Sequence, residues 1–585
     1  MEYSASDPAR QAKPACTFGK FRLEPDGTLI RGGKRLQLAG TELAMLRLLI
    51  ERRGKLVTNA ELGREIGSGA HITSETVAQA IASLRQRLGP EEHIQQVPKR
   101  GFRFISNVVE MQSAPSGVLP HVAFLPLTAE YGVAEYMGTA VAEAAMDDLG
   151  RSQPAVCTLA AKESVATLAK RGLSPLEIGR AMHADMVLTG SLRALPAHHR
   201  MRIEMIDVKH GRQLWTEDVL VERAQHAGLE TELARLITLR TEGGEISISA
   251  TAESESGQQS APQHREAYEL YQRARFEWQS LERHRMQDAV QHLTRASEID
   301  PSFVAARIDL AHLAITEAFH GYLAPSVAVD MVRRASRQGI DFADAAAMLP
   351  AIGWVNFHYD RNLPAAVDAF KRSSHLSHDP WITRARLMLA LSRRRFDEAI
   401  GLIRDALTLD PYSGWLHARL AWAHHLMGDA SESVRLIKAA LDQFPMHEGI
   451  ELYAGIILSL NRDFARAEEV AAALAHRRPY FDLATAVHAY TLAVAGNSDE
   501  ARALLERMEW MGRERYVMNS LSPAVYVALG DHEQALAELA AANQARCPWF
   551  FQALADPRLT PLHDNPEFLQ YEQILVDMER AAGDA

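Results

Sequence analysis

The chain has 585 residues, of which 47% are hydrophobic and 23% are charged, and its formal net charge is −11 at pH 7. This length exceeds what one hydrophobic core fills, so we expect three or four domains, each with enough apolar residues for its own core. The negative charge by itself argues against nucleic-acid binding, unless the charge is unevenly distributed.

The cysteines and the apolar segments indicate the cellular compartment of the protein. The three cysteines, Cys16, Cys157 and Cys547, are far apart and form no CxxC pair, which argues against a disulfide framework and a structural zinc site. No apolar run reaches the roughly 18 residues needed to cross a bilayer, and residues 1–15 lack the apolar centre of a signal peptide. We therefore expect a soluble, cytoplasmic protein with no metal and no membrane partner.

The first predicted domain covers residues 16–110 and follows polar residues, 1–15, that are expected to be disordered. It holds 15 Lys and Arg against 10 Asp and Glu, so it is basic while the rest of the chain is acidic. A basic module at one end is consistent with a DNA-binding surface confined to that end. Its predicted elements are strands over 18–23 and 29–38, helices from Thr41, over 59–66 and over 74–88, and a hairpin that ends near Val109.

The helix predicted over 74–88 has an apolar and a polar face. Ser74 is a good N-cap, and Glu75 is favourable in the first turn. At about 100° per residue, one stripe faces the core and consists of Val77, Ile81, Leu84 and Leu88. The opposite face carries Glu75, Gln79, Ala82, Ser83 and Gln86.

This polar face supplies the first group of candidate DNA-binding residues. Gln79 is the strongest candidate for reading a base, because a carboxamide pairs bidentately with adenine in the major groove. Thr76 and Ser83 are placed to reach phosphates or bases, and Arg85 and Arg87 flank the face along which phosphates would run. The alternative is an ordinary packed helix with a solvated polar face.

The hairpin over 97–104 supplies the second group. Gly101 permits a tight turn, and the cations that would neutralise phosphates or enter a minor groove are Lys99, Arg100 and Arg103.

The order of a strand-rich start, three helices and a basic hairpin, with the segments TELAMLRLLI, SETVAQAIASLRQRL and KRGFRF, resembles the OmpR/PhoB-type winged-helix domain. The resemblance covers about residues 16–109 and implies that 74–88 is the recognition helix and 97–104 the wing. By position it implies contacts from Thr76, Gln79, Ser83, Arg85, Lys99, Arg100 and Arg103. Unlike many members, this chain has alanine at 78, 80 and 82, so we expect tight binding to require tandem occupancy of DNA.

A linker over 111–119 precedes a second predicted domain, 120–225. Strand and helix patterns alternate there, from the apolar run HVAFLPL to a hairpin formed by MRIEMIDV and RQLWTEDV, which predicts an α/β domain. The HVAFLPL run, the segment LSPLEIGRAMHADMVLTGSLRAL and the closing GRQLW resemble the TolB N-terminal-like domain. A small-molecule sensor, a rigid spacer and a dimerisation module all remain open for it.

A Ser-, Gly- and Glu-rich linker over 241–263 leads into a repetitive helical region, 264–585. Three columns recur every 34 residues, the period of tetratricopeptide (TPR) repeats. The small residues are Ala365, Ala399, Ser433, Ala467, Ala501 and Ala535. Turn residues stand five positions earlier, at Asp360, Arg394, Gly428, Arg462, Gly496 and Gly530. The prolines are Pro411, Pro445 and Pro479.

A TPR array presents a concave groove to a protein or peptide. Candidate groove residues are Asn356, Arg386 and Arg419, whereas we interpret Trp354, Trp381, Trp415 and Trp422 as core between helices. The order of winged helix, α/β domain and TPR array resembles one-component regulators, and is similar to the soluble branch that controls invasion genes in enteric pathogens.

The sequence thus predicts a multidomain α/β plus all-α protein that acts as a transcriptional regulator, in the activating sense, on double-stranded promoter DNA. It is expected to bind DNA as a dimer, with the acidic remainder gating dimerisation or contacting RNA polymerase. No glycine-rich phosphate loop, HExxH or GxSxG motif is found, so we expect neither an enzyme nor a cofactor. The alternative is a TPR interaction scaffold whose winged helix has lost DNA binding.

Overall fold

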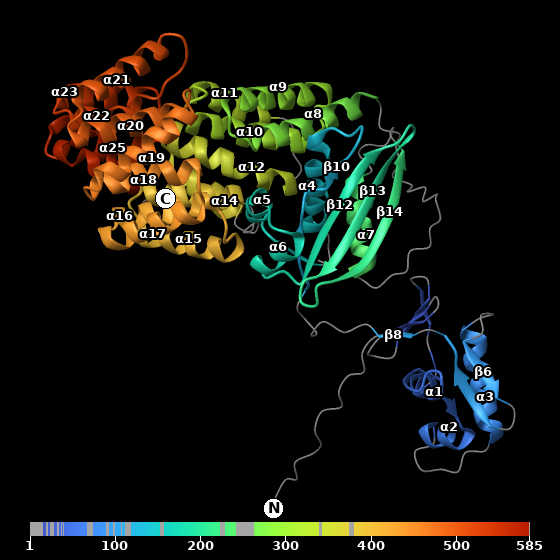
Figure 1. Cartoon of the computed structure of the whole chain (residues 1–585). Coiled ribbons are helices and arrows are strands. Elements are labelled where there is room, and N and C mark those ends of the chain that lie inside the picture. The colour runs from blue at the N-terminus through green and yellow to red at the C-terminus, as the bar shows by residue number, and fades with distance from the viewer. Residues whose placement is uncertain are drawn as a thin grey trace, which may run out of the picture. The chain divides into compact units, whose positions relative to one another are not determined.

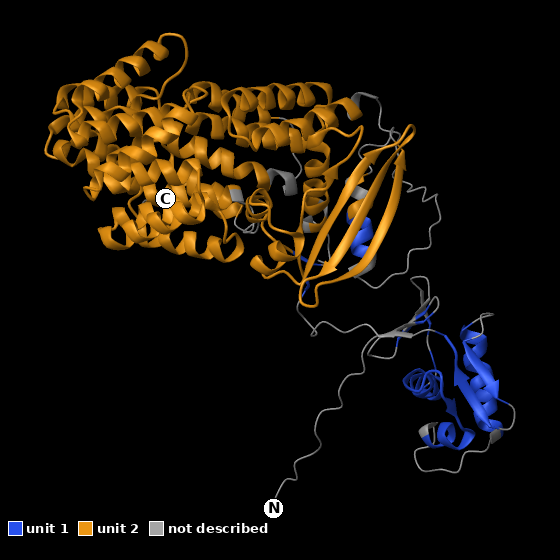
Figure 2. Ribbon diagram, in the orientation of Figure 1, with its two compact units in different colours: residues 1–120, 151–158, 234–252 blue, residues 121–150, 159–233, 253–585 orange. Residues whose placement is uncertain are grey.

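The structure is a computed structural model with two compact units (Figures 1 and 2). The first unit comprises residues 1–120, 151–158 and 234–252, and the second comprises residues 121–150, 159–233 and 253–585. The described residues are 16–18, 21–23, 28–31, 34–36, 38, 40–66, 74–88, 93–97, 100–106, 108–110, 119–151, 157–222, 229–241, 262–337, 342–373 and 380–583. Residues 1–15, Lys99 and most of the two predicted linkers lie outside this part of the chain.

The first unit begins with a short antiparallel sheet in the strand order β4-β3-β2-β1-β8. Phe18 pairs with Phe21 and Arg31 pairs with Lys34, so the chain reverses within each of the two predicted strand runs. The prediction of two unbroken strands is wrong because each run contains glycine between the paired residues, and two-residue hairpin loops favour glycine. The strands are β1 (Cys16–Phe18), β2 (Phe21–Leu23), β3 (Leu29–Arg31), β4 (Lys34–Leu36) and β8 (Val108–Glu110).

Three helices and a second small sheet complete the N-terminal segment of the first unit, residues 1–120. The helices are α1 (Gly40–Glu51), α2 (Asn59–Ile66) and α3 (Ser74–Leu88), and the last two have the predicted bounds. The sheet has the order β5-β7-β6, formed by β5 (Leu56–Val57), β6 (Ile94–Val97) and β7 (Gly101–Phe104). The apolar stripe of α3 is confirmed, since all four of its residues are at most 2% exposed. They share one core with Met45, Leu46 and Leu49 of α1.

An α/β region built on a mixed sheet follows; most of it belongs to the second unit, whereas Arg151, Thr158 and residues 234–241 belong to the first. The order is β11-β9-β12-β13-β14, and β10 pairs with β12. β9 and β12 run parallel, whereas β12, β13 and β14 are antiparallel neighbours. The elements are β9 (His121–Phe124), β10 (Thr128–Ala129), α4 (Glu135–Arg151), β11 (Thr158–Leu159), α5 (Lys162–Lys170), α6 (Pro175–Ala181), β12 (Met186–Ala194), β13 (His198–Asp207), β14 (Arg212–Glu222) and α7 (Leu229–Thr241).

Burial along β13 shows why this segment forms a strand with one covered face. Met201, Ile203 and Met205 are at most 1% exposed, while Arg200 and Arg202 between and beside them are exposed. Side chains alternate between the two faces of a sheet, so the apolar residues at every second position form one side of the core.

The rest of the second unit is an array of helices in which neighbours along the chain pack together, such as α8 with α9 and α16 with α17 (Figure 1). The helices are α8 (Pro262–Trp278), α9 (Arg283–Ile299), α10 (Val304–His320), α11 (Pro325–Ser336), α12 (Phe342–Trp354), α13 (Leu363–Arg372), α14 (Pro380–Ser392), α15 (Phe396–Leu409), α16 (Gly414–Leu426), α17 (Ala430–Gln443), α18 (Glu448–Leu460), α19 (Phe464–Arg477), α20 (Asp482–Ala495), α21 (Ser498–Gly512), α22 (Pro523–Ala528), α23 (His532–Gln544), α24 (Phe550–Leu554) and α25 (Pro566–Gly583). None of the helices within the described ranges is long and apolar enough to cross a membrane.

The repeat columns are confirmed in five of the six repeats. The small residues from Ala399 to Ala535 are fully buried, and the turn residues five positions earlier all have positive φ angles, between 56° and 94°. Each column proline follows a helix end by two residues, as expected for a residue that cannot continue a helix.

The first repeat is shifted by one residue, so its prediction is wrong. The positive φ angle falls on Arg361 rather than Asp360, and the fully buried small residue is Ala366 rather than the half-buried Ala365. A π-helical turn, Val355–Tyr359, immediately precedes this loop. A π-turn takes up one residue more than an α-turn, which accounts for the shift.

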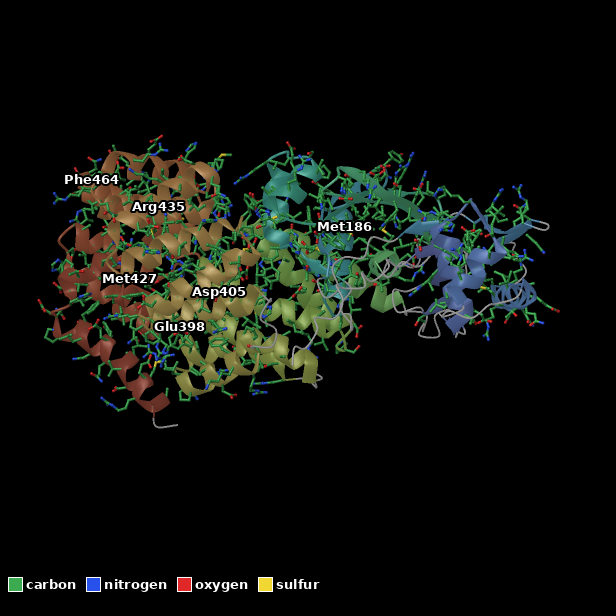
Figure 3. All side chains as sticks on the ribbon, turned by 90° about the horizontal axis from the view of Figure 1, so that it is seen from below. Met186, Glu398, Asp405, Met427, Arg435 and Phe464 are labelled. Carbon is green, nitrogen blue, oxygen red and sulfur yellow. The ribbon has the colours of Figure 1, made fainter. Side chains whose placement is uncertain are left out.

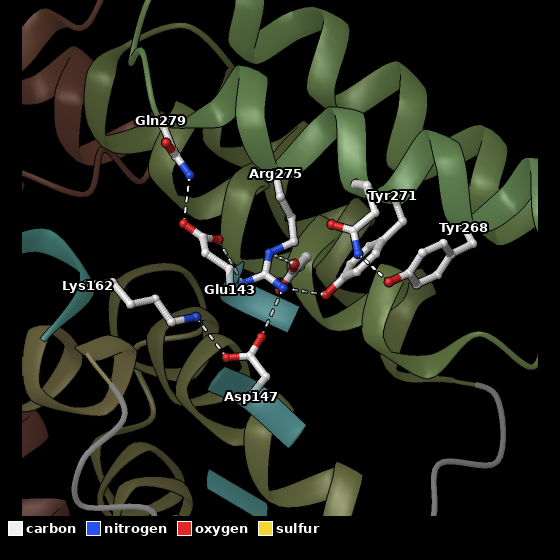
Figure 4. A network of polar contacts seen from close by, with 9 residues as sticks. Glu143, Asp147, Lys162, Tyr268, Tyr271, Arg275 and Gln279 are labelled. Carbon is white, nitrogen blue, oxygen red and sulfur yellow. Dashed lines mark hydrogen bonds and ion pairs between the residues drawn. The ribbon is translucent and has the colours of Figure 1, made fainter. Parts of the chain in front are cut away.

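A largely buried arginine, Arg275, joins the α/β region to the array within the second unit (Figure 4). Arg275 of α8 is 15% exposed and lies 2.9 Å from Asp147 and 3.2 Å from Glu143, both on α4. Its Nε is 3.9 Å from Asp309 of α10, and Lys162 donates a 2.7 Å hydrogen bond to Asp147. Elements far apart in the sequence are thus connected by one guanidinium.

Candidate nucleic-acid interface

Helix α3 exposes a polar face beside its buried stripe. Thr76, Gln79 and Gln86 are exposed, as are Glu75 and Ala82. The core contacts of Val77, Ile81, Leu84 and Leu88 fix the rotation of the helix, so these exposed residues face away from the domain core. Gln79 is therefore an exposed carboxamide on a face that also carries the short side chains of Thr76 and Ala82.

Two of the predicted DNA-binding residues on α3 are bonded to Glu42 of α1, which is 4% exposed. The Ser83 hydroxyl donates a 2.6 Å hydrogen bond to Glu42, and Arg87 Nε lies 3.0 Å from the same carboxylate. The Arg87 side chain is nevertheless 46% exposed. Both residues hold α3 against α1. Glu42 could not be found from the sequence of α3, because it lies about forty residues away along the chain.

Arg85 is the third predicted residue with a partner inside the domain. Its Nε donates a 3.1 Å hydrogen bond to the Ile94 carbonyl at the start of β6, and its guanidinium lies 5.9 Å from the Phe102 ring centroid on β7. The side chain is half-buried. Arg85 therefore attaches the hairpin to α3 and sets the distance between the two candidate DNA-contacting elements.

The hairpin is held close to β5, and this explains the requirement for Gly101. Gly101 has a φ of 140°, and a Cβ atom there would lie 2.1 Å from the Val57 carbonyl oxygen. Arg100 is exposed at the turn beside it, whereas Arg103 is half-buried on β7. Arg100 is thus the predicted wing cation that the structure shows to be exposed to solvent. Lys99 lies outside the described residues.

Sequence reasoning missed several polar residues next to this surface. Gln95 and Gln96 on β6 are exposed, and so are Arg53 and Lys55 after α1. The run Arg-Arg-Gly-Lys at 52–55 was the available signal. Arg52 forms a 2.6 Å ion pair with Glu61, and hydrogen bonds from Thr58 lower the pKa of Glu61 to about 2, so this part of the basic run also serves the start of α2.

The three predicted groove residues of the array do not lie at one site in the structure. Arg419 is buried and lines a cavity of about 490 Å³, whereas Arg386 is exposed and Asn356 half-buried, and neither lines the cavity. The four tryptophans interpreted as core between helices all line it as well: Trp354, Trp381, Trp415 and Trp422. The interpretation of these tryptophans as core is therefore incomplete. The spacing of apolar residues along a helix is the same whether they pack tightly together or line a cavity.

Comparisons with known proteins find family matches for two segments of the chain. Residues 33–104 match the family described as "Transcriptional regulatory protein, C terminal", and residues 390–454 match a tetratricopeptide repeat family. The transcriptional regulator HilA of Salmonella typhi is 23% identical over 573 residues, covering 93% of this chain and 97% of that protein.

Two solved structures are also similar to parts of the chain. The DNA-binding domain of E. coli CadC is 24% identical with a TM-score of 0.16, covering 17% of this chain and 99% of that one. TolB from Acinetobacter baumannii is 18% identical with a TM-score of 0.17, covering 22% and 30%. From the two family matches and the described fold, the protein combines an N-terminal winged-helix domain of the transcriptional-regulator type, a mixed α/β region and a C-terminal tetratricopeptide array.

Proposed function

We propose that the protein is a sequence-specific transcriptional regulator that reads promoter DNA with the exposed face of α3. The observation that carries the proposal is the exposed polar face of α3, together with the exposed Arg100 of the hairpin, in a domain that matches the transcriptional-regulator family. The likeness to the regulator HilA over nearly the whole chain supports it.

The candidate residues fall into two groups: those proposed to contact DNA directly and those that also hold α3 in place within the domain. Gln79 would read a base, and Thr76 and Arg100 would contact the backbone. Ser83, Arg85 and Arg87 would act at the edge of the interface, since each already holds α3 in place. The hairpin cations that complete the proposed contact are Lys99 and Arg103.

The remaining parts of the proposal concern partners. The protein would occupy repeated half-sites as a dimer in the cytoplasm, where promoter DNA lies, and activate transcription through a contact with RNA polymerase. The array would receive a protein, peptide or other signal, since tetratricopeptide arrays are built for such recognition.

A gel-shift titration of promoter DNA with the full chain tests the proposal. Arg100→Ala should weaken binding to all sequences and reduce the salt dependence, because it removes one phosphate contact. Gln79→Ala should relax the preference at one base position by about 1–3 kcal/mol. Arg295→Ala removes an exposed cation of α9 in the second unit and serves as the matched control. Binding with no sequence preference, or equal effects of Arg100→Ala and Arg295→Ala, would refute the assignment.

A scaffold without DNA binding is the second candidate, favoured by the internal bonds of Ser83, Arg85 and Arg87. Such a protein would elute from a DNA column at low salt, whereas a regulator would be retained and released in a salt-dependent manner.

A further inference from the structure

The helical array contains a hollow with aromatic walls, which we call the tryptophan cavity. Its volume is about 490 Å³, within the range of small-molecule sites. Five of the eight tryptophans of the chain line it: Trp354, Trp381, Trp415, Trp422 and Trp549. Glu398 and Asp405 of α15 and Arg435 of α17, by contrast, are exposed charges on the outside of the array (Figure 3). Most of the tryptophans of the chain therefore line this one hollow.

Arg419 of α16 is a buried cation in this cavity. It is 4% exposed, and its guanidinium carbon lies 5.0–5.4 Å from the ring centroids of Trp415, Tyr453 and Trp549. In the described structure the guanidinium donates one hydrogen bond, from Nη1 to Gln552 Oε1 at 3.4 Å, and its Nε has no partner. A guanidinium has five N–H donors and stays charged in proteins, so most of the donor capacity of Arg419 is unused.

The carboxylates of the cavity do not balance this charge, because each is paired with another arginine. The pairs are Glu163 with Arg384, at 3.5 Å, Glu448 with Arg478, and Asp556 with Arg558, at 2.6 Å. A buried charge without a counter-ion is unfavourable. A ligand that carries a negative group would remove this cost.

Two further polar atoms belong to cavity-lining side chains and have no hydrogen-bond partner among the described residues. They are His312 Nε2 and Trp354 Nε1, on side chains that are 2% and 4% exposed. Burial lowers the pKa of His312 to about 3, so its ring is neutral at pH 7. The His312 ring is stacked on the Trp381 ring, with 4.5 Å between the ring centroids. Unsatisfied buried polar atoms that cluster at one cavity call for a ligand with its own polar atoms.

We propose that the tryptophan cavity binds a small organic monocarboxylate with a flat aromatic body. The carboxylate pairs with Arg419, because Arg419 is a buried cation whose charge none of the cavity carboxylates balances, whereas Lys170 is exposed to solvent. The flat body stacks against the indole rings, whose faces prefer planar partners. Glu163 and Lys170 of α5 also line the cavity, so the ligand contacts the α/β region as well as the array. The inference deepens the signal-receiving part of the proposed function, and it is measured without DNA.

Titration calorimetry of the full chain tests the inference with three probes: 1-naphthoate, its neutral analogue 1-naphthamide, and octanoate. We expect 1-naphthoate to bind with a Kd below about 100 µM. The amide should bind about tenfold more weakly because it lacks the charge. Octanoate should bind several-fold more weakly because it cannot stack. No binding of 1-naphthoate at about 1 mM, or equal affinity for acid and amide, overturns the proposal.

Two variants locate the site. Arg419→Gln should weaken 1-naphthoate binding by about 10- to 100-fold and leave 1-naphthamide unchanged. Arg435→Gln removes an exposed arginine of α17 outside the cavity and should change neither. Unchanged 1-naphthoate binding by Arg419→Gln contradicts the assignment. If the Arg419→Gln variant loses its helical circular dichroism signal, the proposal is judged on the unaltered chain, by the ratio of its affinities for 1-naphthoate and 1-naphthamide. Octanoate binding as tightly as 1-naphthoate contradicts the flat ligand. Failure of DNA binding affects none of these results.

Discussion

The two units use buried charge in opposite ways. In the first unit a buried carboxylate, Glu42, receives a hydrogen bond from Ser83 and an ion pair from Arg87. In the second unit a largely buried cation, Arg275, is surrounded by the carboxylates of Glu143, Asp147 and Asp309. The first arrangement orients one helix of a small domain, whereas the second connects an α/β region to an array. Glu42 and Arg275, the central residues of the two arrangements, are not among the residues proposed to contact a ligand.

The largest expected effect comes from Arg275→Met. The change leaves three carboxylates close together without their common cation, and breaking a buried ion pair costs about 3–5 kcal/mol. Thermal unfolding of the full chain, followed by circular dichroism, measures the loss. Arg265→Met on the same helix removes an exposed partner of Glu269 and should cost less than about 1 kcal/mol. Equal losses in the two variants would show that Arg275 is not the connecting residue.

A smaller effect is expected from Glu42→Gln. The amide keeps the shape of the side chain but loses the charge that holds Arg87, and a hydrogen bond to a charged group contributes about 1.5–3 kcal/mol. Hydrogen exchange of α3 peptides in the full chain should accelerate accordingly, while peptides of the array stay unchanged. Glu75→Gln, an exposed change on α3 itself, is the control. If both variants exchange alike, Glu42 does not orient the helix.

The smallest effect concerns pH and tests the crowding of carboxylates around Arg275. Burial raises the pKa of Asp309 to about 6, although Arg275 opposes the shift. For an acid whose folded pKa is raised, the stabilising protonated form is fully present below the unfolded pKa of about 4 and is lost as pH rises through about 6. The melting temperature of Asp309→Asn should therefore rise relative to the unaltered chain between pH 4.5 and pH 7.5. A constant difference would contradict the raised pKa.

The helices that carry function could be predicted from local sequence. The bounds of α2 and α3, the buried stripe of α3 and five of six repeats follow from periodicity, caps and small-residue columns. Such signals lie within one helix or one repeat, so they are visible without knowing the fold.

The internal partners of the candidate residues could not be predicted in this way. Glu42 meets Ser83 and Arg87 only after α1 and α3 pack, and Arg419 lies far in sequence from Trp549 and Gln552. The shift at Arg361 follows from a π-helical turn, which has no sequence signal in the 34-residue period. These features depend on the folded structure, and the pattern of residue types along the chain does not reveal them.

Photo-crosslinking from position 79 tests the central claim most directly. The full chain with Gln79→p-benzoylphenylalanine is irradiated on promoter DNA, and the same substitution at the exposed Gln213 of β14 is the control. The proposed placement of α3 in the major groove predicts crosslinks from position 79 to bases at defined positions of each half-site, and none from position 213. Crosslinks from both positions at similar yield, or none from position 79 on DNA that the protein demonstrably binds, would contradict it.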